Sequence, residues 1–349
     1  MMDHYPIFCI SGYSGAGKTT VIVPVIEALC ARGLKVGIIK HDVHGLNIDC
    51  EGKDTDRFFK AGADVFIRGP EQAFFRAHRR GDISLDTLLR RLGPHYDIII
   101  AEGHKTTPLP YKVWLCGEDD APPPPETTGI QRVLKRDEDR VRIVLEMIDA
   151  WLPDAWQKAP VYAGILIGGG STRFGKPKHL QTSGGQTWLE RAIETVKPHV
   201  DGIALLGAGD LPASAQSLPV LCDIPGRRGP LAGILAATRW MPQASWLFIP
   251  CDLPLLTGDA VRWILDQRRP GVWAVLPQLT DAPAPEPLLA YYDFRSFAQL
   301  ECMRRPVDMA SADNVSSPVV PQGLQASWTN VNTAEDLAAA NTRGGGVCR

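Results

Sequence analysis

The stretch IFCISGYSGAGKTT, residues 7–20, places an apolar run before a glycine-rich loop and the first turn of a helix-like segment. The loop fits the pattern G-x-x-x-x-G-K-[ST], in which backbone amides curl around phosphate oxygens. The helix amino terminus adds its positive end, the lysine reaches the outer phosphates, and the threonine hydroxyl ligates magnesium. We therefore expect a nucleotide-phosphate site formed by Gly12, Gly15, Gly17, Lys18, Thr19 and Thr20.

Short apolar runs alternate with helix-like stretches through most of the chain, which is the pattern of β-α-β units around a parallel sheet. Before residue 160, we expect strands at 7–11, 35–40, 64–68, 96–101 and 111–116, and helices after the loop and at 54–62, 84–93 and 137–151. After it, we expect strands at 161–168, 202–208, 245–250 and 272–277, and helices at 188–196, 230–241 and 258–268. Both halves are therefore predicted to be α/β.

The length and composition indicate two ordinary globular domains. The 349 residues exceed a usual single core, so we expect one domain at 1–158 and a second at 159–349, divided within residues 152–160. The proline-rich segment 121–129 is interpreted as a loop inside the first domain. With 37 basic and 39 acidic side chains, the bulk charge favours neither nucleic acid nor a membrane surface as a partner.

The cysteines and the amino terminus favour a cytoplasmic protein. The eight cysteines form no C-x-x-C pair, and several lie in apolar runs, where a reduced thiol packs as a small hydrophobe. The first residues lack the basic and apolar regions of a signal peptide, and the sequence has no apolar run long enough to span a membrane. We therefore expect neither export nor membrane insertion.

Glu102 is the candidate acid for a metal at the first phosphate site. It ends the apolar run of YDIIIAEGHK, residues 96–105, and a parallel sheet brings that strand end to the edge where the glycine-rich loop lies. A carboxylate at this edge suits magnesium together with the hydroxyl of Thr19. The alternative is that Glu102 only caps the loop that follows it.

The segment VGIIKHDVHGLNIDCEGKDTDRFFKAGAD, residues 36–64, resembles the molybdopterin-guanine dinucleotide biosynthesis adaptor family, MobB, as do the glycine-rich loop and AEGHK. The resemblance covers most of residues 5–150 and implies a P-loop domain that binds and hydrolyses GTP. It also implies that Lys40, His41 and residues 52–57 line the site beyond the loop. KHDVH would otherwise suggest a transition-metal site, but the sequence supplies no clear further ligand for one.

A second glycine-rich loop follows an apolar run in GILIGGGSTRFGKPKHL, residues 164–180. It lacks both the G-K-[ST] ending and the spacing of G-x-G-x-x-G, so by itself it is equally a basic, solvated turn. Three later segments favour a site. They are DIPGRRGPLAGI (223–234), a tight turn into a helix; IPCDLPLL (249–256), with a carboxylate suited to magnesium between two prolines; and WTNVNTAEDLAAA (328–340), with a capping box.

These segments in this order are similar to the molybdenum cofactor guanylyltransferase family, MobA, over residues 160–342. The resemblance implies a nucleotidyltransferase domain that uses Mg²⁺, GTP and molybdopterin. The residues that it implies as catalytic are Lys178, Arg173 and Asp252, with Asp252 on the metal. Those that it implies at the nucleotide are Gly168, Gly169, Gly170, Lys178, Asp223, Gly229 and Gly233.

The chain departs from the family pattern beside the loop lysine. Pro177 stands where the family usually has an acidic residue, and Lys176 is an additional base. Which of Lys176 and Lys178 contacts phosphate therefore stays open, as does the efficiency of transfer. Asp223 is equally a turn residue, and the two arginines at 227–228 either meet the pterin phosphate or form a solvated rim.

Together the two resemblances imply an α/β chain of two doubly wound domains, a P-loop NTPase domain followed by a Rossmann-like nucleotidyltransferase domain. The implied reaction moves GMP from GTP to molybdopterin, giving the guanine dinucleotide cofactor and pyrophosphate. Two alternatives stay open: a transfer-inactive molybdopterin carrier with a GTPase switch, and a nucleotidyltransferase for another substrate, such as CTP on molybdopterin or a sugar phosphate. The expected partners are molybdopterin-inserting or molybdenum-loading proteins, apo-molybdoenzymes and a second copy of the chain.

Overall fold

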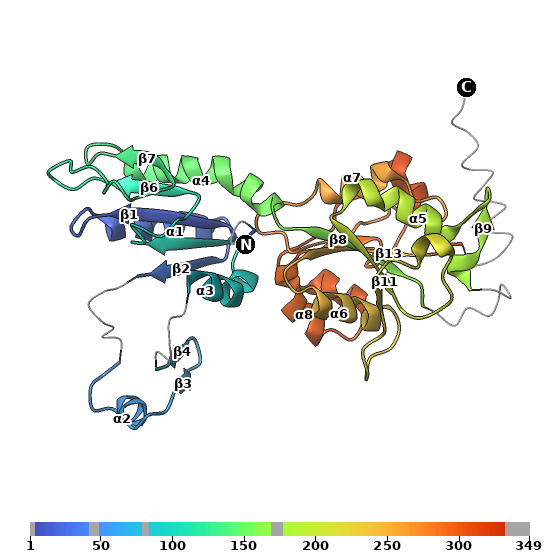
Figure 1. Cartoon of the computed structure of the whole chain (residues 1–349), viewed down its shortest axis with the longest axis horizontal. Coiled ribbons are helices and arrows are strands. Elements are labelled where there is room, and N and C mark those ends of the chain that lie inside the picture. The colour runs from blue at the N-terminus through green and yellow to red at the C-terminus, as the bar shows by residue number, and fades with distance from the viewer. Residues whose placement is uncertain (1–3, 42–48, 79–83, 169–176, 332–349) are drawn as a thin grey trace.

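The computed structural model describes residues 4–41, 49–78, 84–168 and 177–331. Figure 1 shows two lobes, each built around its own sheet and joined through the long helix α4. The elements of the first lobe are β1 (Ile7–Gly12), α1 (Lys18–Ala31), β2 (Val36–Lys40), α2 (Asp54–Lys60), β3 (Val65–Arg68), β4 (Ala73–Arg76), α3 (Leu85–Leu92), β5 (Ile98–Glu102), β6 (Lys112–Leu115), β7 (Ile130–Leu134) and α4 (Arg140–Gln157).

The main sheet of the first lobe is parallel, in the order β2-β5-β1-β6-β7. Its central strand β1 is buried on both faces, as expected for a parallel strand between two helical layers. Phe8 and Ile10 pack with the apolar sides of α1 and α4, while Ile7 and Cys9 pack on the other face with Leu89 of α3. The predicted α/β layering is therefore confirmed, and the proline-rich segment lies between the paired strands β6 and β7.

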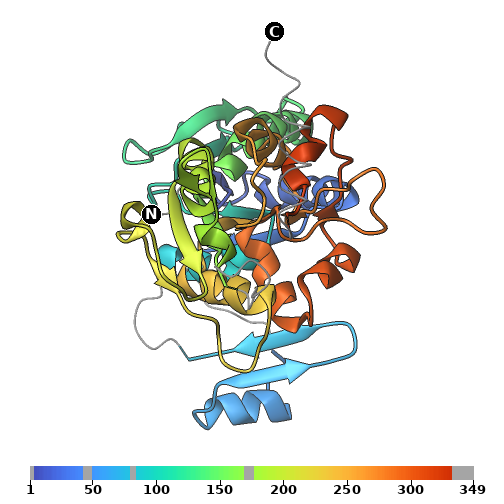
Figure 2. The ribbon, with the colours of Figure 1, turned by 90° about the vertical axis from the view of Figure 1, so that its right-hand side faces the viewer.

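The predicted strand at 64–68 is present as β3, but it does not join the parallel sheet. It pairs antiparallel with β4, and Figure 2 shows this hairpin and α2 projecting away from both lobes. Phe66 and Phe75 lie opposite each other on the hairpin and are 66% and 62% exposed. The short apolar run correctly indicated a strand, but such a run carries no information about which sheet the strand joins.

The second lobe contains β8 (Val161–Leu166), β9 (Thr182–Ser183), β10 (Gln186–Thr187), α5 (Trp188–Val196), β11 (Gly202–Leu206), β12 (Val220–Leu221), α6 (Pro230–Trp240), β13 (Ser245–Pro250), α7 (Gly258–Leu265), β14 (Ala274–Val275), β15 (Ala290–Tyr292), α8 (Phe297–Cys302) and β16 (Val315–Ser316). Its main sheet has the order β12-β11-β8-β13-β15-β14-β16. Only β15 runs antiparallel to its neighbours, β13 and β14. The apolar sides of α5 and α7 pack on one face, and those of α6 and α8 on the other.

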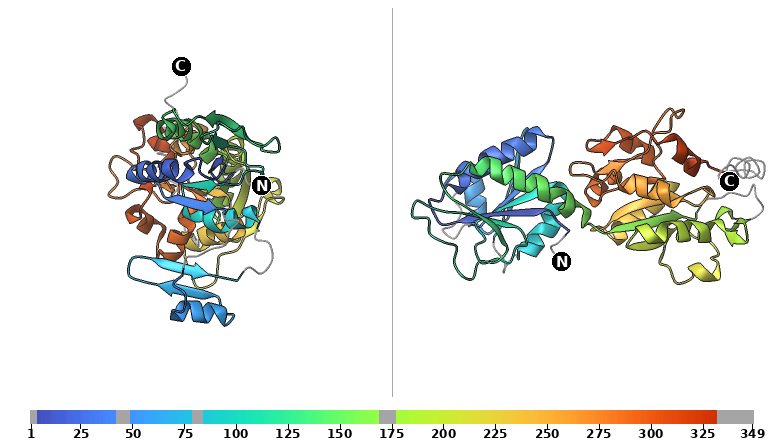
Figure 3. Two further views of the ribbon diagram at one scale, coloured as in Figure 1. Left: turned by 90° about the vertical axis from the view of Figure 1, so that its left-hand side faces the viewer. Right: turned by 90° about the horizontal axis from the view of Figure 1, so that it is seen from above.

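The two lobes meet at the amino ends of their strands. Asp97, directly before β5, accepts a hydrogen bond of 2.6 Å from Nε1 of Trp273, directly before β14. The ammonium of Lys35 lies 3.9 Å from the centre of the same indole, and Nε of Arg295 donates to the carbonyl oxygen of Tyr96 at 2.8 Å. The carboxyl edges of the two sheets therefore face away from each other, as the end-to-end lobes of Figure 3 show.

Candidate functional site

The glycine-rich loop follows the carboxyl end of β1 and leads directly into α1. A Cβ at Gly12 would lie 2.6 Å from the carbonyl oxygen of Leu115, so only glycine fits there. Gly17 caps α1 with a φ of 80°, which a side chain would strain. Nζ of Lys18 donates to the carbonyl oxygens of Gly12 at 3.2 Å and Tyr13 at 2.8 Å, and burial lowers the pKa of Lys18. The loop therefore lies between a strand and a helix, as the sequence predicts.

The remaining residues predicted for this site gather at the same edge of the sheet. Thr19 and Thr20 are exposed in the first turn of α1. Glu102 ends β5 beside Ile10 of β1, and its Oε2 lies 3.8 Å from Nζ of Lys40. A cavity of about 530 Å³ adjoins the loop and is lined by Tyr13, Ser14, Gly15, Gly117, Glu118, Asp119 and Ala121.

Two buried bases that sequence reasoning did not single out hold this site in shape. The Arg140 guanidinium of α4 donates to the carbonyl oxygens of Ala16 at 2.9 Å and Cys116 at 2.7 Å, which fixes the glycine-rich loop to the neighbouring strand. Nζ of Lys112 donates to three carbonyl oxygens of residues 104–107, the loop after Glu102. A lysine inside the apolar run YKVWLC was a usable signal, whereas an arginine in an amphipathic helix is not.

The histidines near this edge do not complete a metal site in the part of the chain that the structure describes. The rings of His41 and His104 have centroids 5.4 Å apart. Asp42 and His44, the other residues of the KHDVH interpretation, lie outside the described residues. Among the described ranges, no group of three His, Cys, Asp or Glu side chains is placed to hold a metal ion.

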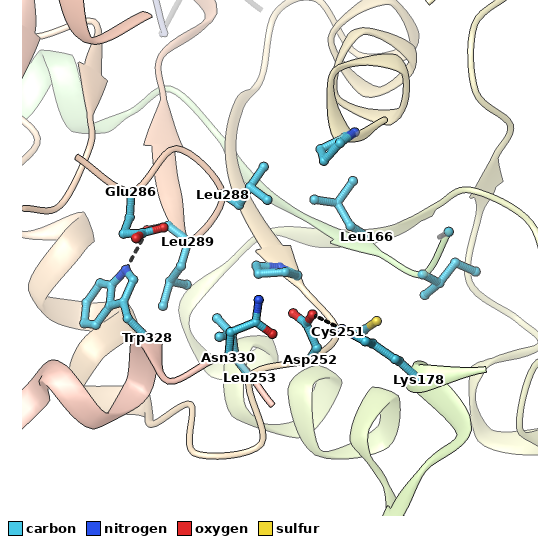
Figure 4. Close-up of a pocket in the computed structure, with 14 residues that line it drawn as sticks. Leu166, Lys178, Cys251, Asp252, Leu253, Glu286, Leu288, Leu289, Trp328 and Asn330 are labelled. Atoms are coloured by element: carbon cyan, nitrogen blue, oxygen red, sulfur yellow. Dashed lines mark hydrogen bonds and ion pairs between the residues drawn. The ribbon is translucent and has the colours of Figure 1, made fainter. Parts of the chain in front are cut away.

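A cavity of about 340 Å³ lies at the carboxyl ends of β8 and β13 in the second lobe (Figure 4). β8 and β13 are adjacent and parallel, so the segments that follow them reach one edge of the sheet. The polar and backbone groups around the cavity come from Gly168, Lys178, Pro230, Asp252, Glu286 and Asn330.

Lys178 and Asp252 form an ion pair in this cavity. Nζ of Lys178 lies 2.8 Å from Oδ2 of Asp252, and the two side chains are only 17% and 14% exposed. The other oxygen, Oδ1, is buried and has no hydrogen-bond partner within the described ranges. The backbone of Asp252 is held by a hydrogen bond of 3.1 Å from the amide of Val331. A fixed carboxylate with one open oxygen fits a divalent cation.

Cys251 lies next to this pair but is not a nucleophile at neutral pH. Burial, with a smaller contribution from the Asp252 charge, raises the pKa of the Cys251 thiol to about 12. The thiol is therefore protonated in the physiological range, and the thiolate is the reactive form of cysteine.

The turn before α6 is built as the sequence predicts, but only part of it reaches the cavity. Gly229 caps α6 with a φ of 67°, and the next residue, Pro230, lines the cavity. Asp223 is exposed and lies against Gly233, where a Cβ would be 3.4 Å from its Oδ1. The Arg227 guanidinium donates to two backbone carbonyl oxygens, those of residues 301 and 303. Arg227 thus anchors the turn.

Several residues predicted for the second site lie outside the described residues, and two residues that were not predicted line its cavity. Gly169, Gly170 and Arg173 lie outside the described residues, as do Lys176 and the predicted helix after Thr333. Glu286 and Trp328 line the cavity, although no sequence motif indicated them. Nε1 of Trp328 donates to the carbonyl oxygen of Leu289 at 3.3 Å, and burial raises the pKa of Glu286.

Comparison with known families places each half of the chain. Residues 7–125 match the model described as molybdopterin guanine dinucleotide synthesis protein B, and residues 163–312 match the MobA-like NTP transferase domain. None of the described helices is long and apolar enough to cross a membrane.

Individual related proteins also match either the first or the second half of the chain. A molybdopterin-guanine dinucleotide biosynthesis adapter protein of Haemophilus influenzae is 35% identical over 36% of this chain and 71% of its own length. A Bacillus cereus protein named "probable molybdenum cofactor guanylyltransferase" is 30% identical over 51% of this chain and 95% of its own length. The crystal structure of molybdopterin-guanine dinucleotide biosynthesis protein A from Archaeoglobus fulgidus aligns with 52% of this chain and 98% of its own, at 24% identity and a TM-score of 0.42.

Proposed function

Because the chain belongs to the molybdopterin-guanine dinucleotide adapter family through its first half and to the molybdenum cofactor guanylyltransferase family through its second, we propose that it is bifunctional. The second lobe transfers GMP from GTP to molybdopterin, and the first lobe binds GTP. The observation that carries the transfer is the Lys178–Asp252 pair, which lies in a cavity beside Gly168 at the carboxyl edge of the sheet.

In the proposed reaction, a phosphate oxygen of molybdopterin attacks the α-phosphorus of GTP. A new P–O bond forms, the bond from the α-phosphorus to the bridging oxygen breaks, and its electron pair leaves on pyrophosphate. A phosphate monoester is largely dianionic at pH 7, since its second pKa is about 6, so the reaction needs no strong general base. The residues must instead hold two anions in line and neutralise the charge that develops on pyrophosphate.

The residues of the second site are assigned on this basis. Asp252 is the residue that would hold Mg²⁺. Its Oδ1 is buried and has no hydrogen-bond partner among the described residues, while Lys178 holds its Oδ2 in place. Mg²⁺ bound there supplies positive charge at the α-phosphate. Lys178, together with Arg173, stabilises the leaving pyrophosphate, and the backbone amides of residues 168–170 hold the nucleotide. Asp223, Gly229 and Gly233 form the guanosine side of the site.

The first lobe is proposed to bind and hydrolyse GTP. Lys18 already points its ammonium at the centre of the loop, where the outer phosphates of a nucleotide bind in loops of this pattern. Thr19 and Glu102 offer a hydroxyl and a carboxylate at one sheet edge, which is a donor set that suits Mg²⁺.

Incubation of the purified chain with molybdopterin and either GTP or CTP, each labelled at the α-phosphate, tests the proposal. We expect labelled guanine dinucleotide cofactor and unlabelled pyrophosphate from GTP, and no comparable product from CTP. Product from CTP alone would instead identify a cytidylyltransferase. Retention of molybdopterin with no product from either nucleotide would identify a carrier.

We further propose that the chain acts in the cytoplasm, delivers its product to apo-molybdoenzymes with the help of molybdenum-loading or molybdopterin-inserting proteins, and assembles as a homo-oligomer. The seven cysteines that the structure describes are free thiols, which suits a reducing compartment. We place the domain division between residues 158 and 159, since α4 ends at Gln157 and β8 begins at Val161.

A further inference from the structure

Glu286 lines the cavity that contains Lys178 and Asp252, and the proposed reaction gives this carboxylate no role. It is half-buried, and burial raises the pKa of its side chain. Its carboxylate has no hydrogen-bond or ionic partner among the residues that the structure describes, in contrast to Asp252, which is paired with Lys178. Figure 4 shows it beside Leu289 and Trp328, across the cavity from Lys178.

Strand order places Glu286 on the acceptor side of the cavity. Gly168 follows β8, Asp252 follows β13, and Glu286 lies just before β15, with β13 between the other two strands. β15 is antiparallel to β13 and Ala290 pairs with Phe248, so the residues before Ala290 extend past the carboxyl end of β13. Asp252 is thus flanked by the nucleotide loop on one side and by Glu286 on the other.

In-line transfer places the attacking oxygen opposite the leaving oxygen, so the acceptor phosphate approaches the α-phosphorus from the side away from the pyrophosphate. With the triphosphate at the loop after β8, the attacking phosphate and the ring attached to it approach from the side of β15. The groups there are the Glu286 carboxylate, the side chains of Leu288 and Leu289, and the indole of Trp328. Apolar and aromatic walls with one polar group are typical of a site for a flat heterocycle.

From this arrangement we propose that Glu286 recognises the pterin ring of molybdopterin through its 2-amino-4-oxo edge. That edge presents two parallel N–H donors, from N3 and from the 2-amino group, and an ionised carboxylate offers two acceptors at matching spacing. Guanine has an equivalent edge, but the guanine belongs to the nucleotide, which lies on the other side of Asp252. The inference rests on the proposed function, and it names the residue that selects the acceptor.

Glu286→Gln tests the inference with little change in shape, because the amide keeps the size of the carboxylate but presents one donor and one acceptor. Asp281→Asn is the matched control, since Asp281 is exposed in the same loop between β14 and β15. In the transfer assay, Glu286→Gln is expected to raise KM for molybdopterin ~10- to 100-fold. KM for GTP and the Mg²⁺ requirement are expected to stay within about twofold, and the control to match the wild type in all three.

A binding measurement separates this inference from the proposed reaction. Fluorescence titrations use pterin, which carries the 2-amino group, and lumazine, which has an oxygen in its place. The wild type is expected to bind pterin at least ~10-fold more tightly than lumazine, and Glu286→Gln to lose this preference, because an amide can pair with the lumazine edge. Unchanged melting temperatures show that both variants are folded. Glu286→Asp, with a shorter carboxylate, is expected to keep a weakened preference.

The outcomes are distinguishable. A pterin preference that depends on Glu286 in a protein that makes no dinucleotide supports the inference and overturns the proposed reaction. Dinucleotide formation with unchanged KM for molybdopterin and an unchanged pterin preference in Glu286→Gln overturns the inference and leaves the reaction standing. A rise confined to KM for GTP, or to the Mg²⁺ requirement, also overturns it, because Glu286 would then belong to the nucleotide or the metal.

Discussion

Replacing Asp252 with asparagine isolates the charge that the proposed transfer depends on. The amide oxygen still accepts a hydrogen bond from Lys178, so the 2.8 Å contact is retained in a site where the two side chains are 17% and 14% exposed. The change removes the negative charge and the open oxygen Oδ1. An electrostatic group aimed at charge in the transition state contributes about 3–4 kcal/mol, so kcat is expected to fall by roughly 10²–10³. Because the two side chains are mostly buried, removing one charge of the pair also lowers the free energy of unfolding, by up to about 3–5 kcal/mol.

The assay follows dinucleotide formation with saturating GTP, molybdopterin and Mg²⁺, and a parallel urea titration follows the free energy of unfolding. Asp259→Asn is the control, because Asp259 is 72% exposed in the first turn of α7, away from the cavity. GTP binding by the first lobe is expected to be unchanged in both variants. A kcat for Asp252→Asn within tenfold of the control, in a folded protein, would refute the assignment of Asp252 to the metal and to catalysis.

Four further predictions concern the first lobe and its contact with the second. Lys18→Ala should abolish GTP hydrolysis by the first lobe, measured as phosphate release, while the rate of guanylyl transfer stays within about threefold, because the phosphate sites are separate; complete loss of transfer in a folded variant would contradict this. Arg140→Met should lower the free energy of unfolding by about 2–3 kcal/mol and weaken GTP binding, since the carbonyl of Ala16 loses a charged donor. An unchanged urea midpoint would contradict the role of Arg140 in holding the glycine-rich loop. Trp273→Phe should cost about 1–3 kcal/mol by leaving an oxygen of Asp97 without its donor. Because burial raises the pKa of Asp97, its contribution to stability is greatest below the unfolded pKa of about 4 and falls as the pH rises through the folded pKa, so Asp97→Asn should flatten the pH dependence of the urea midpoint in that window.

Local signals in the sequence were sufficient to locate the glycine-rich loop between β1 and α1 and most helices. The predicted helix at 188–196 is α5 with the same bounds, because Thr187 and Glu190 form a capping box at its start and apolar residues recur along one face. Helix α4 runs six residues past its predicted end and contains Pro153, since burial of Leu152 and Trp156 outweighs the lost backbone hydrogen bond.

The parts that the sequence did not reveal depend on long-range pairing. β15 has three residues and follows a proline-rich loop, so no periodic pattern marks it, yet its antiparallel register with β13 brings Glu286 to the cavity. Trp328 ends a short 3₁₀ segment that is far from Asp252 in the sequence. The segment that contains Asp252 and the glycine run that precedes Lys178 in the sequence could be identified because each begins directly after an apolar strand. Glu286 instead precedes the antiparallel strand β15, so no apolar strand before it marks its position in the sequence.

The contact between the lobes, through Asp97 and Trp273, affects how substrates and products enter and leave the two sites. The sheet edges that carry the glycine-rich loop of the first lobe and Asp252 of the second lie at opposite poles of the described structure, with the contact between the lobes in the middle. Nucleotide, cofactor and product must exchange with the surrounding solution at each pole. A protein that docks at one pole therefore leaves the other free, and the chain can accept molybdopterin or release its dinucleotide at one end while a second protein occupies the other.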